Sequence, residues 1–301
     1  MINVGNKPKT YRIATAQSVI CVDSITLDKI KDGISPKGNL FETARIAATM
    51  GAKRTSEFIP YCHSIPIDGI DIEFKIESNC IRVIVTVHSI WNTGVEMESL
   101  TGASIAALTI YDMLKPLDPS LTIESLKVIK KHGGVSDFHN FKDAKLDAVV
   151  IVVSDSRTIS SDKSGKIITN TLKTHGFNIV DYKIITDDSS IIEKELKYFC
   201  DEAMVDIILT TGGTGVGPRD VTPEATKRVL EKDVNGIVEC LRNYGQQRTP
   251  LAMLSRGVAG IRGSTIIVNL PGSVDGVSQS LNSLFPWIMH VFEIISGNNH
   301  G

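Results

Sequence analysis

The sequence predicts two consecutive domains of different fold class, an α+β domain followed by a doubly wound α/β domain with a mostly parallel sheet. Three observations support this. The chain has 301 residues, enough for two domains. Polar and apolar residues alternate in its first half, as in half-buried strands. After residue 143, strand-like apolar runs alternate with helical patterns. We therefore place the domains at residues 1–142 and 143–301.

In the second half, the order of elements predicts where a ligand binds. A parallel sheet covered by helices on both faces binds ligands beyond the carboxyl ends of its strands. Asp155, Asp187, Gly212 and Gly272 each follow an expected strand, so we expect one crevice to gather them. The expected strands are 147–154, 177–186, 205–211 and 265–270, and the expected helices are 165–175, 191–202, 223–230, 236–244 and 274–290.

The first half has the pattern of an antiparallel sheet with helices on one face. Apolar and polar residues alternate cleanly over residues 70–76 and more weakly over residues 82–88, which predicts two half-buried strands. Helical patterns flank them at 41–49 and 100–114. The polar segment 139–145 predicts a short linker between the domains.

Composition excludes several classes of protein. The net charge of −2 gives no electrostatic case for binding nucleic acid or an anionic membrane. The longest aliphatic run, 148–153, is too short to span a bilayer, and the first residues lack the features of a signal peptide. The five cysteines are scattered and form no C-x-x-C pair, which disfavours a zinc or iron–sulfur site and suits a reducing compartment. We expect a cytoplasmic protein.

The most informative segment is the glycine-rich stretch 209–224, LTTGGTGVGPRDVTPE. It predicts a strand, a glycine loop and a helix start, a geometry in which backbone N–H groups can bind an anion. Its spacing matches neither a Walker A loop nor the dinucleotide fingerprint. Asp220 places a carboxylate where a phosphate would bind, and their repulsion of roughly 4 kcal/mol at 4 Å calls for a cation between them. We therefore expect Asp220 to bind magnesium.

This stretch resembles the molybdopterin-binding family of molybdenum cofactor biosynthesis, and most of all molybdopterin adenylyltransferase. Three further segments agree with this family in order, SDS after the first expected strand, DD after the second and NLPGS after the last, so the resemblance covers roughly residues 146–296. It implies transfer of AMP from ATP to molybdopterin with magnesium, and no permanently bound cofactor. Asp187 and Asp220 match the family's two important aspartates. The implied binding residues are Ser154, Asp155, Gly212, Gly213, Thr214, Gly215, Pro271, Gly272 and Ser273.

In the first half of the chain, residues that suggest catalysis lie close together in the sequence. Glu96 and Glu98 are two residues apart, and Asp112 and Lys115 are three apart near the end of an expected helix. Taken singly, each of these residues is as well explained by an ordinary surface pair or a solvated carboxylate. Lysines, a histidine and carboxylates together suit acid–base chemistry on a phosphorylated substrate.

The segments KGNLFETARIAATMGAKRT, IPYCH and TGVEMESLTGASIAALTIYDMLK resemble cyclic pyranopterin monophosphate synthase over residues 1–138. The resemblance implies a ferredoxin-like fold, sites shared between subunits, and conversion of a cyclised dihydroguanosine triphosphate to the cyclic pterin phosphate with release of pyrophosphate. The loop 131–138 departs from the family, because Val135 stands where a lysine is usual. The implied catalytic residues are Asp112, Lys37 and Lys115, and the implied substrate-binding residues are Tyr61, Cys62, His63, Glu96, Met97 and Glu98.

The leading interpretation is a bifunctional enzyme acting on pterin and nucleotide substrates. One alternative is a synthase fused to a pterin-binding domain that has no catalysis of its own. A second is a nucleotide-dependent oxidoreductase, which the lack of a dinucleotide fingerprint disfavours. Both family resemblances imply three-fold symmetry, so we expect a homotrimer or a hexamer.

Overall fold

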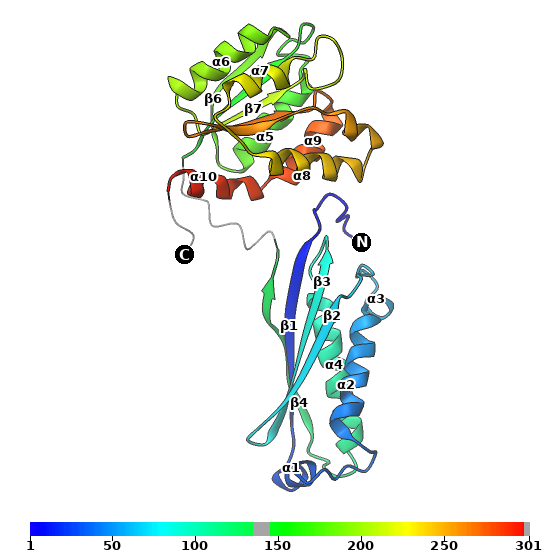
Figure 1. Ribbon diagram of the computed structural model, residues 1–301. Helices are drawn as coiled ribbons and strands as arrows, with labels where there is room; N and C mark the ends of the chain where they lie inside the picture. Colours follow the sequence, from blue (N-terminus) through cyan, green and yellow to red (C-terminus); the bar gives the residue numbers. More distant parts are fainter. Residues whose placement is uncertain (135–144, 298–301) are drawn as a thin grey trace. The chain divides into compact units, whose positions relative to one another are not determined.

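The computed structural model describes residues 1–134 and 145–297 (Figure 1). The chain forms two compact units, Met1–Asp137 and Phe138–Gly301, and each is described by itself. The boundary expected between residues 142 and 143 lies outside the described residues, as does nearly all of the expected linker. Within the described ranges, every helix is too short or too polar to cross a membrane.

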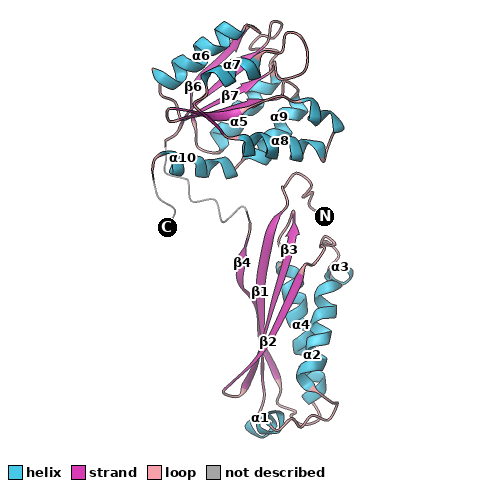
Figure 2. Cartoon of the chain, viewed as in Figure 1, coloured by secondary structure: helices cyan, strands magenta, loops and turns pink. Residues whose placement is uncertain are grey.

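The first unit is an antiparallel sheet with helices on one face, which confirms the α+β class (Figures 1 and 2). The strand order in space is β2-β3-β1-β4, and every neighbouring pair is antiparallel. Two of these strands, β1 and β4, were not predicted from the sequence. The elements are β1 (Thr10–Cys21), α1 (Ser24–Lys31), α2 (Leu40–Lys53), α3 (Thr55–Phe58), β2 (Gly69–Glu77), β3 (Cys80–Trp91), α4 (Glu96–Leu114) and β4 (Thr122–His132).

Small side chains let α2 and α4 pack closely against each other and against the sheet. Ala48 and Ala52 of α2 and Ala103 of α4 are almost fully buried. A Cβ on Gly102 would lie 3.2 Å from the carbonyl oxygen of Ala48, so the two helix backbones nearly touch there. The close packing fixes α4, which carries functional candidates at both of its ends.

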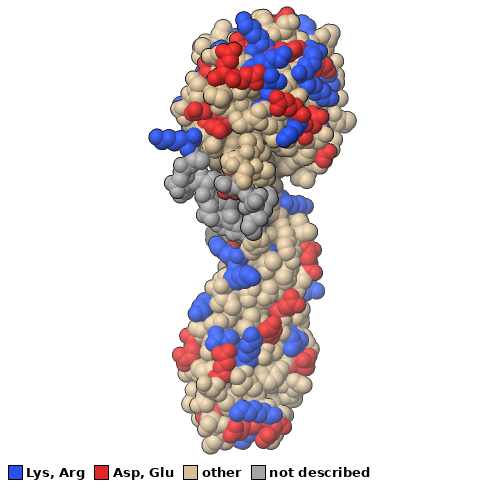
Figure 3. Space-filling model, turned by 60° about the vertical axis from the view of Figure 1, so that its left-hand side comes forward, with Lys and Arg blue, Asp and Glu red and all other residues tan. Residues whose placement is uncertain are grey.

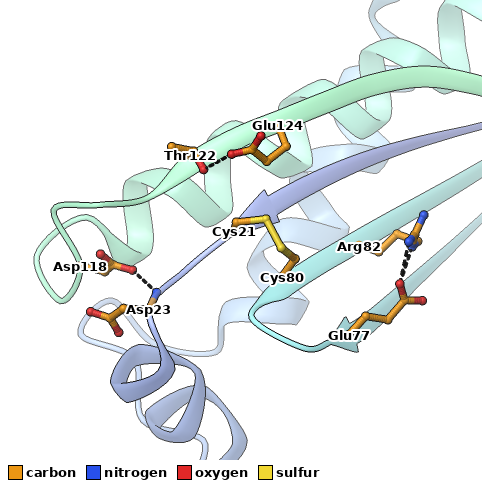
Figure 4. Close-up of a disulfide and its surroundings, with 8 residues drawn as sticks. All are labelled: Cys21, Asp23, Glu77, Cys80, Arg82, Asp118, Thr122 and Glu124. Atoms are coloured by element: carbon orange, nitrogen blue, oxygen red, sulfur yellow. Dashed lines mark hydrogen bonds and ion pairs between the residues drawn. A yellow bond between two sulfur atoms is a disulfide. The ribbon is translucent and has the colours of Figure 1, made fainter.

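A disulfide joins the ends of β1 and β3 (Figure 4). Cys21 and Cys80 are direct partners in the strand register, with their Cα atoms 4.0 Å apart. The interpretation of the cysteines as a scattered set that suits a reducing compartment did not foresee this pair, because only the strand register brings together two positions 59 residues apart. Close by, the side chain of Asp118 accepts a 2.7 Å hydrogen bond from the backbone N–H of Asp23.

The second unit is a doubly wound sheet in the order β6-β5-β7-β10-β9-β8. The first four strands are parallel, as expected, and β9 and β8 add an antiparallel edge, so the sheet is mixed. The elements are β5 (Asp147–Val153), α5 (Lys163–Thr174), β6 (Asn178–Ile185), α6 (Ser189–Asp201), β7 (Ile207–Thr211), α7 (Thr222–Val229), β8 (Lys232–Asp233), α8 (Asn235–Gln246), η2 (Pro250–Leu254), β9 (Ala259–Arg262), β10 (Thr265–Leu270), α9 (Val274–Leu284), η3 (Trp287–Met289) and α10 (His290–Ile295).

Each face of this sheet has its own core. Alternate residues of β5 divide between them: Val150 packs with α5, α8 and α9, whereas Ile151 packs with α6 and α7. The expected single helix 274–290 was wrong in its length, because α9 ends at Leu284, before Pro286. The parallel strands bring the loops after β5, β6, β7 and β10 to one edge of the sheet.

Charged side chains are distributed without a dominant patch on the face of the molecule that Figure 3 shows. Lysine and arginine side chains are interspersed with aspartate and glutamate on both units.

Candidate functional site

In the first unit, two lysines converge on one carboxylate. Lys37 Nζ lies 2.7 Å from Asp112 Oδ2, and Lys115 Nζ lies 2.8 Å from Asp112 Oδ1. Asp112 lies in the last turn of α4, Lys115 is the C-cap of this helix, and Lys37 comes from the loop before α2. The structure thus brings together all three residues that the resemblance implied as catalytic.

The electrostatics of this cluster favour its fully ionised form. Hydrogen bonds from Lys115 and then Lys37 lower the pKa of Asp112 to about 2. The bond to Asp112 in turn raises the pKa of Lys115. Two cations against one anion leave a net positive charge, and all three side chains are about half exposed. The net positive charge suits an anionic group such as a phosphate, and removal of either lysine would raise the pKa of Asp112.

A second cluster surrounds the start of α4. Glu98 is only 3% exposed, and its Oε2 atom is buried without a hydrogen-bond partner among the described residues. Burial, and then the nearby charge of Glu96, raises the pKa of Glu98 to about 7. Burial and the charge of Glu98 also raise the pKa of the Cys62 thiol. Glu98 is therefore a carboxyl group that carries a proton for part of the time at neutral pH.

The remaining residues of this cluster are more accessible. His63 Nε2 lies 2.9 Å from the backbone carbonyl oxygen of Ile2. Tyr61 is 80% exposed, and Met97 is 38% exposed. Within this unit neither side chain is packed away, so both are free to contact a substrate or another subunit.

The two clusters lie at opposite ends of α4. Asp112 lies fourteen positions after Glu98 in this helix. At 1.5 Å per residue, this is about 21 Å along the helix axis. A single copy of the unit therefore does not bring all of the expected residues of the first domain into one site.

A basic cavity of about 220 Å³ adjoins the Glu96 end of the unit. Its charged lining includes residues that the sequence analysis passed over. They lie on three separate segments, which the antiparallel pairing of β1 with both β3 and β4 brings together. The loop around Val135 lies outside the described residues. The charged residues that line the cavity are Lys7, Arg12, Glu96, Lys131 and His132.

In the second unit, the glycine loop follows β7 directly and needs its glycines. Gly212 and Gly213 have φ angles of 103° and 61°. A Cβ on Gly212 would lie 2.2 Å from the carbonyl oxygen of Val153, and one on Gly213 would lie 2.8 Å from Asp187 Oδ1. The loops after β5, β6 and β7 therefore meet at this point, as the strand order predicts.

Three aspartates face one another across these loops. The backbone N–H of Asp187 donates to Asp155 Oδ1 at 3.1 Å, and Asp155 Oδ2 lies 3.2 Å from Arg219. Burial, followed by the charges of Asp155 and Asp220, raises the pKa of Asp187. Arg219 opposes this rise, but the three carboxylates outnumber this one cation, and oxygen ligands of this kind suit Mg²⁺.

The aspartates do not form a complete metal site by themselves. Within residues 1–134 and 145–297, no three His, Cys, Asp or Glu side chains are arranged to hold a metal ion. The backbone N–H of Gly217 donates to Asp220 Oδ2 at 2.7 Å, which fixes this carboxylate against the loop. Mg²⁺ commonly takes one or two carboxylates and completes its shell with water and substrate phosphates, so the arrangement fits a metal that arrives with a nucleotide.

The turn after β10 is held against the glycine loop by side chains. Thr211 Oγ1 donates to the carbonyl oxygen of Pro271 at 2.6 Å. Arg157 and Ser164 donate to that of Gly272 at 2.7 and 3.1 Å. Ser273 caps α9, and the Ser154 hydroxyl accepts bonds within its own turn, so both side chains also have structural roles.

A cavity of about 560 Å³ lies beside the glycine loop. It combines the expected Thr214, Gly215 and residues 271–273 with a wall formed by α8, η2 and α9. This wall was not predicted from the sequence, because its polar residues lie on helices and a loop whose orientation the tertiary fold sets. A mixed apolar and polar cavity of this size suits a bicyclic ligand. The missed polar residues are Arg242, Arg248, Thr249, Ser255, Asp275, Gln279 and Ser280.

Comparison with known proteins finds a different family for each half of the chain. Residues 1–134 match the MoaC family, and residues 149–290 match the probable molybdopterin binding domain. A molybdenum cofactor biosynthesis bifunctional protein of Chlorobaculum tepidum is 36% identical over the whole chain and 96% of its own length. The bifunctional protein of Synechococcus elongatus is 34% identical over the whole chain and 99% of its own length.

Relatives of the single halves are also found. Cyclic pyranopterin monophosphate synthase of Peptoclostridium acidaminophilum is 46% identical over 45% of this chain and 87% of its own length. Among solved structures, the molybdopterin biosynthesis enzyme MoaB of Thermus thermophilus is 39% identical over 51% of this chain and 98% of its own, with a TM-score of 0.48.

Proposed function

Because this chain belongs to the family of bifunctional molybdenum cofactor biosynthesis proteins, we propose a division of labour between its two units. The chain is an enzyme with a cyclic pyranopterin monophosphate synthase domain and a molybdopterin-binding domain. We assign the conversion of cyclised dihydroguanosine triphosphate to the first unit and the adenylylation of molybdopterin to the second. The convergence of Lys37 and Lys115 on Asp112 supports the first assignment most directly.

In the synthase reaction, two carboxyl groups with oppositely shifted pKa values take different roles. Asp112 is ionised and holds the two lysines in place, ready to bind an anionic oxygen of the substrate. Glu98, with a pKa of about 7, is suited to donate and recover a proton. The cavity lined by Lys7, Arg12 and Lys131 would bind the triphosphate.

The synthase site is proposed to lie between subunits of a ferredoxin-like domain. The β-α-β-β-α-β element order and the strand order β2-β3-β1-β4 support this fold. The separation of about 21 Å along α4 argues that Asp112 of one copy meets Glu98 and His63 of another. The edge strand β4 exposes Ile123, Leu126 and Ile129, as expected of a surface that another copy covers. We propose a trimer-based assembly, and a monodisperse monomer in light scattering would contradict it.

In the second unit, Asp187 and Asp220 would hold Mg²⁺ together with the phosphates of ATP. When bound, the ion would neutralise charge on the transferring phosphoryl group. The glycine loop would direct its N–H groups at the phosphates. The cavity beside Thr214 and Gly272 would hold the pterin and orient its terminal phosphate toward the nucleotide. The three aspartates around the loop are the observation that supports this assignment.

The test is ATP-dependent adenylylation of molybdopterin by the full-length chain, with and without magnesium, with product detection by mass. We expect product only with magnesium. Asp220→Asn should abolish it and keep the fold, whereas Asp233→Asn, an exposed carboxylate on β8, should not change it. If the wild type binds molybdopterin and forms no product, the second unit is a binding module without catalysis, and the transferase assignment is wrong.

A further inference from the structure

Arg256 makes an unusual set of bonds to the glycine loop. Its Nε and Nη2 atoms each donate at 2.6 Å, to the carbonyl oxygens of Gly215 and Asp220. Its backbone N–H donates at 2.9 Å to the carbonyl oxygen of Thr214. Its Nη1 atom pairs with Glu224 in the first turn of α7. One residue therefore holds three carbonyl groups of a single loop.

These bonds determine where the amide groups of the loop point. The loop's peptide bonds are trans, so each N–H points away from the carbonyl oxygen of the preceding residue. With the three carbonyls turned toward Arg256, the N–H groups of Gly215, Val216 and Val221 point away from it. In the described part of the chain, none of these three N–H groups donates to a backbone carbonyl. They remain available to an anion.

We propose that Arg256 is a positioning residue for adenylyl transfer, because it binds the carbonyl side of the glycine loop and thereby aims the loop's amides and Asp220 at the nucleotide phosphates. The proposal rests on the adenylyltransferase function assigned above. Without the guanidinium, the carbonyl dipoles of Gly215 and Asp220 would be free to turn toward the site, where they would repel phosphate, whereas the backbone N–H of residue 256 would still hold the carbonyl of Thr214. Arg256 itself touches neither substrate in this scheme.

The position of Arg256 also connects the two halves of the site. Its chain neighbours Ser255 and Gly257 line the cavity assigned to the pterin. Arg256 itself bonds to the loop assigned to the nucleotide. Arg256 therefore anchors both the wall of the pterin cavity and the backbone of the nucleotide loop. We expect loss of Arg256 to weaken binding of the nucleotide more than binding of the pterin.

The experiment compares Arg256→Gln and Arg256→Lys with two controls in the full-length chain. Glu224→Gln removes the ion pair but leaves the three carbonyl bonds. Arg262→Lys breaks the two-point pairing with Asp201, remote from the loop, and controls for general destabilisation. Two quantities are measured: kcat/KM for ATP with magnesium, and the Kd for magnesium–ATP by calorimetry without molybdopterin. The melting temperature of each variant is recorded alongside them.

We expect Arg256→Gln to lower kcat/KM roughly 10- to 100-fold and to weaken ATP binding by about tenfold, with a melting temperature close to that of Arg262→Lys. Arg256→Lys should recover part of the loss, because an ammonium group can hold one or two of the carbonyls. Wild-type values for Arg256→Gln would overturn the inference, and so would an equal loss in Glu224→Gln. A wild type that binds ATP but forms no product would refute the transferase function alone, since the binding data would still test Arg256.

Discussion

The buried carboxyl group of Glu98 should make the first unit less stable as pH rises through neutrality. The pKa of Glu98 is about 7 in the fold, against an ordinary value of 4.5. Between these values the folded chain binds more protons than the unfolded chain, so its stability falls as pH increases. At about 1.4 kcal/mol per pKa unit, the loss is about 3 kcal/mol for each chain, complete above pH 7 and absent below pH 4.5.

Glu98→Gln places an uncharged isostere at this position and should remove the effect. The variant should unfold with a free energy close to that of the wild type at pH 5 and about 3 kcal/mol higher at pH 8. The assay is urea unfolding followed by tryptophan fluorescence at a fixed protomer concentration. The chain has two tryptophans, so a Trp287→Phe background leaves Trp91 of β3 as the reporter of the first unit.

The matched control is Glu73→Gln, which neutralises an exposed carboxylate on β2. This variant should show no gain that depends on pH. The reasoning is refuted if Glu98→Gln and the wild type differ by the same amount at both pH values. It is also refuted if the variant is the less stable protein at pH 8, because Glu98 would then be stabilised as an anion.

Three further predictions concern other parts of the chain. Asp112→Asn should lower synthase turnover by about 100-fold or more, measured as product formation, and leave adenylylation by the same preparation unchanged. Cys21→Ser should cost the first unit roughly 2–4 kcal/mol under oxidising conditions, and a wild type that unfolds identically with and without reductant would contradict this. The rate of adenylylation should fall at acidic pH as Asp187 is protonated, at a pH above the ordinary Asp value of 3.8, since burial, Asp155 and Asp220 raise this pKa. Added magnesium should shift that loss to lower pH, which pH–rate profiles at two magnesium concentrations would show.

Local sequence patterns were sufficient wherever a single segment determined the structure. The alternating residues 82–88 lie in β3, where Val83, Val85 and Val87 are fully buried. The glycine loop was predictable because its conformation depends on its own glycines and on the strand before it.

The sequence did not predict features that depend on contacts between segments distant in the chain. β1 carries small and polar residues that are buried, such as Ser18, so it lacks a period of two. Arg256 lies over 30 residues beyond the loop that it holds, and nothing near it in sequence marks that role. The disulfide depended on a strand register that composition could not supply.

The length of α4 has a consequence for genetics. If Asp112 and Glu98 of one chain belong to different active sites, two inactive variants can complement each other in a mixed oligomer. A mixed pair, with one chain altered at Asp112 and its partner at Glu98, would combine both lesions in one site and leave the other site intact. Two alleles that each abolish the synthase could then restore growth together, whereas two alleles altered at the same end of the helix could not.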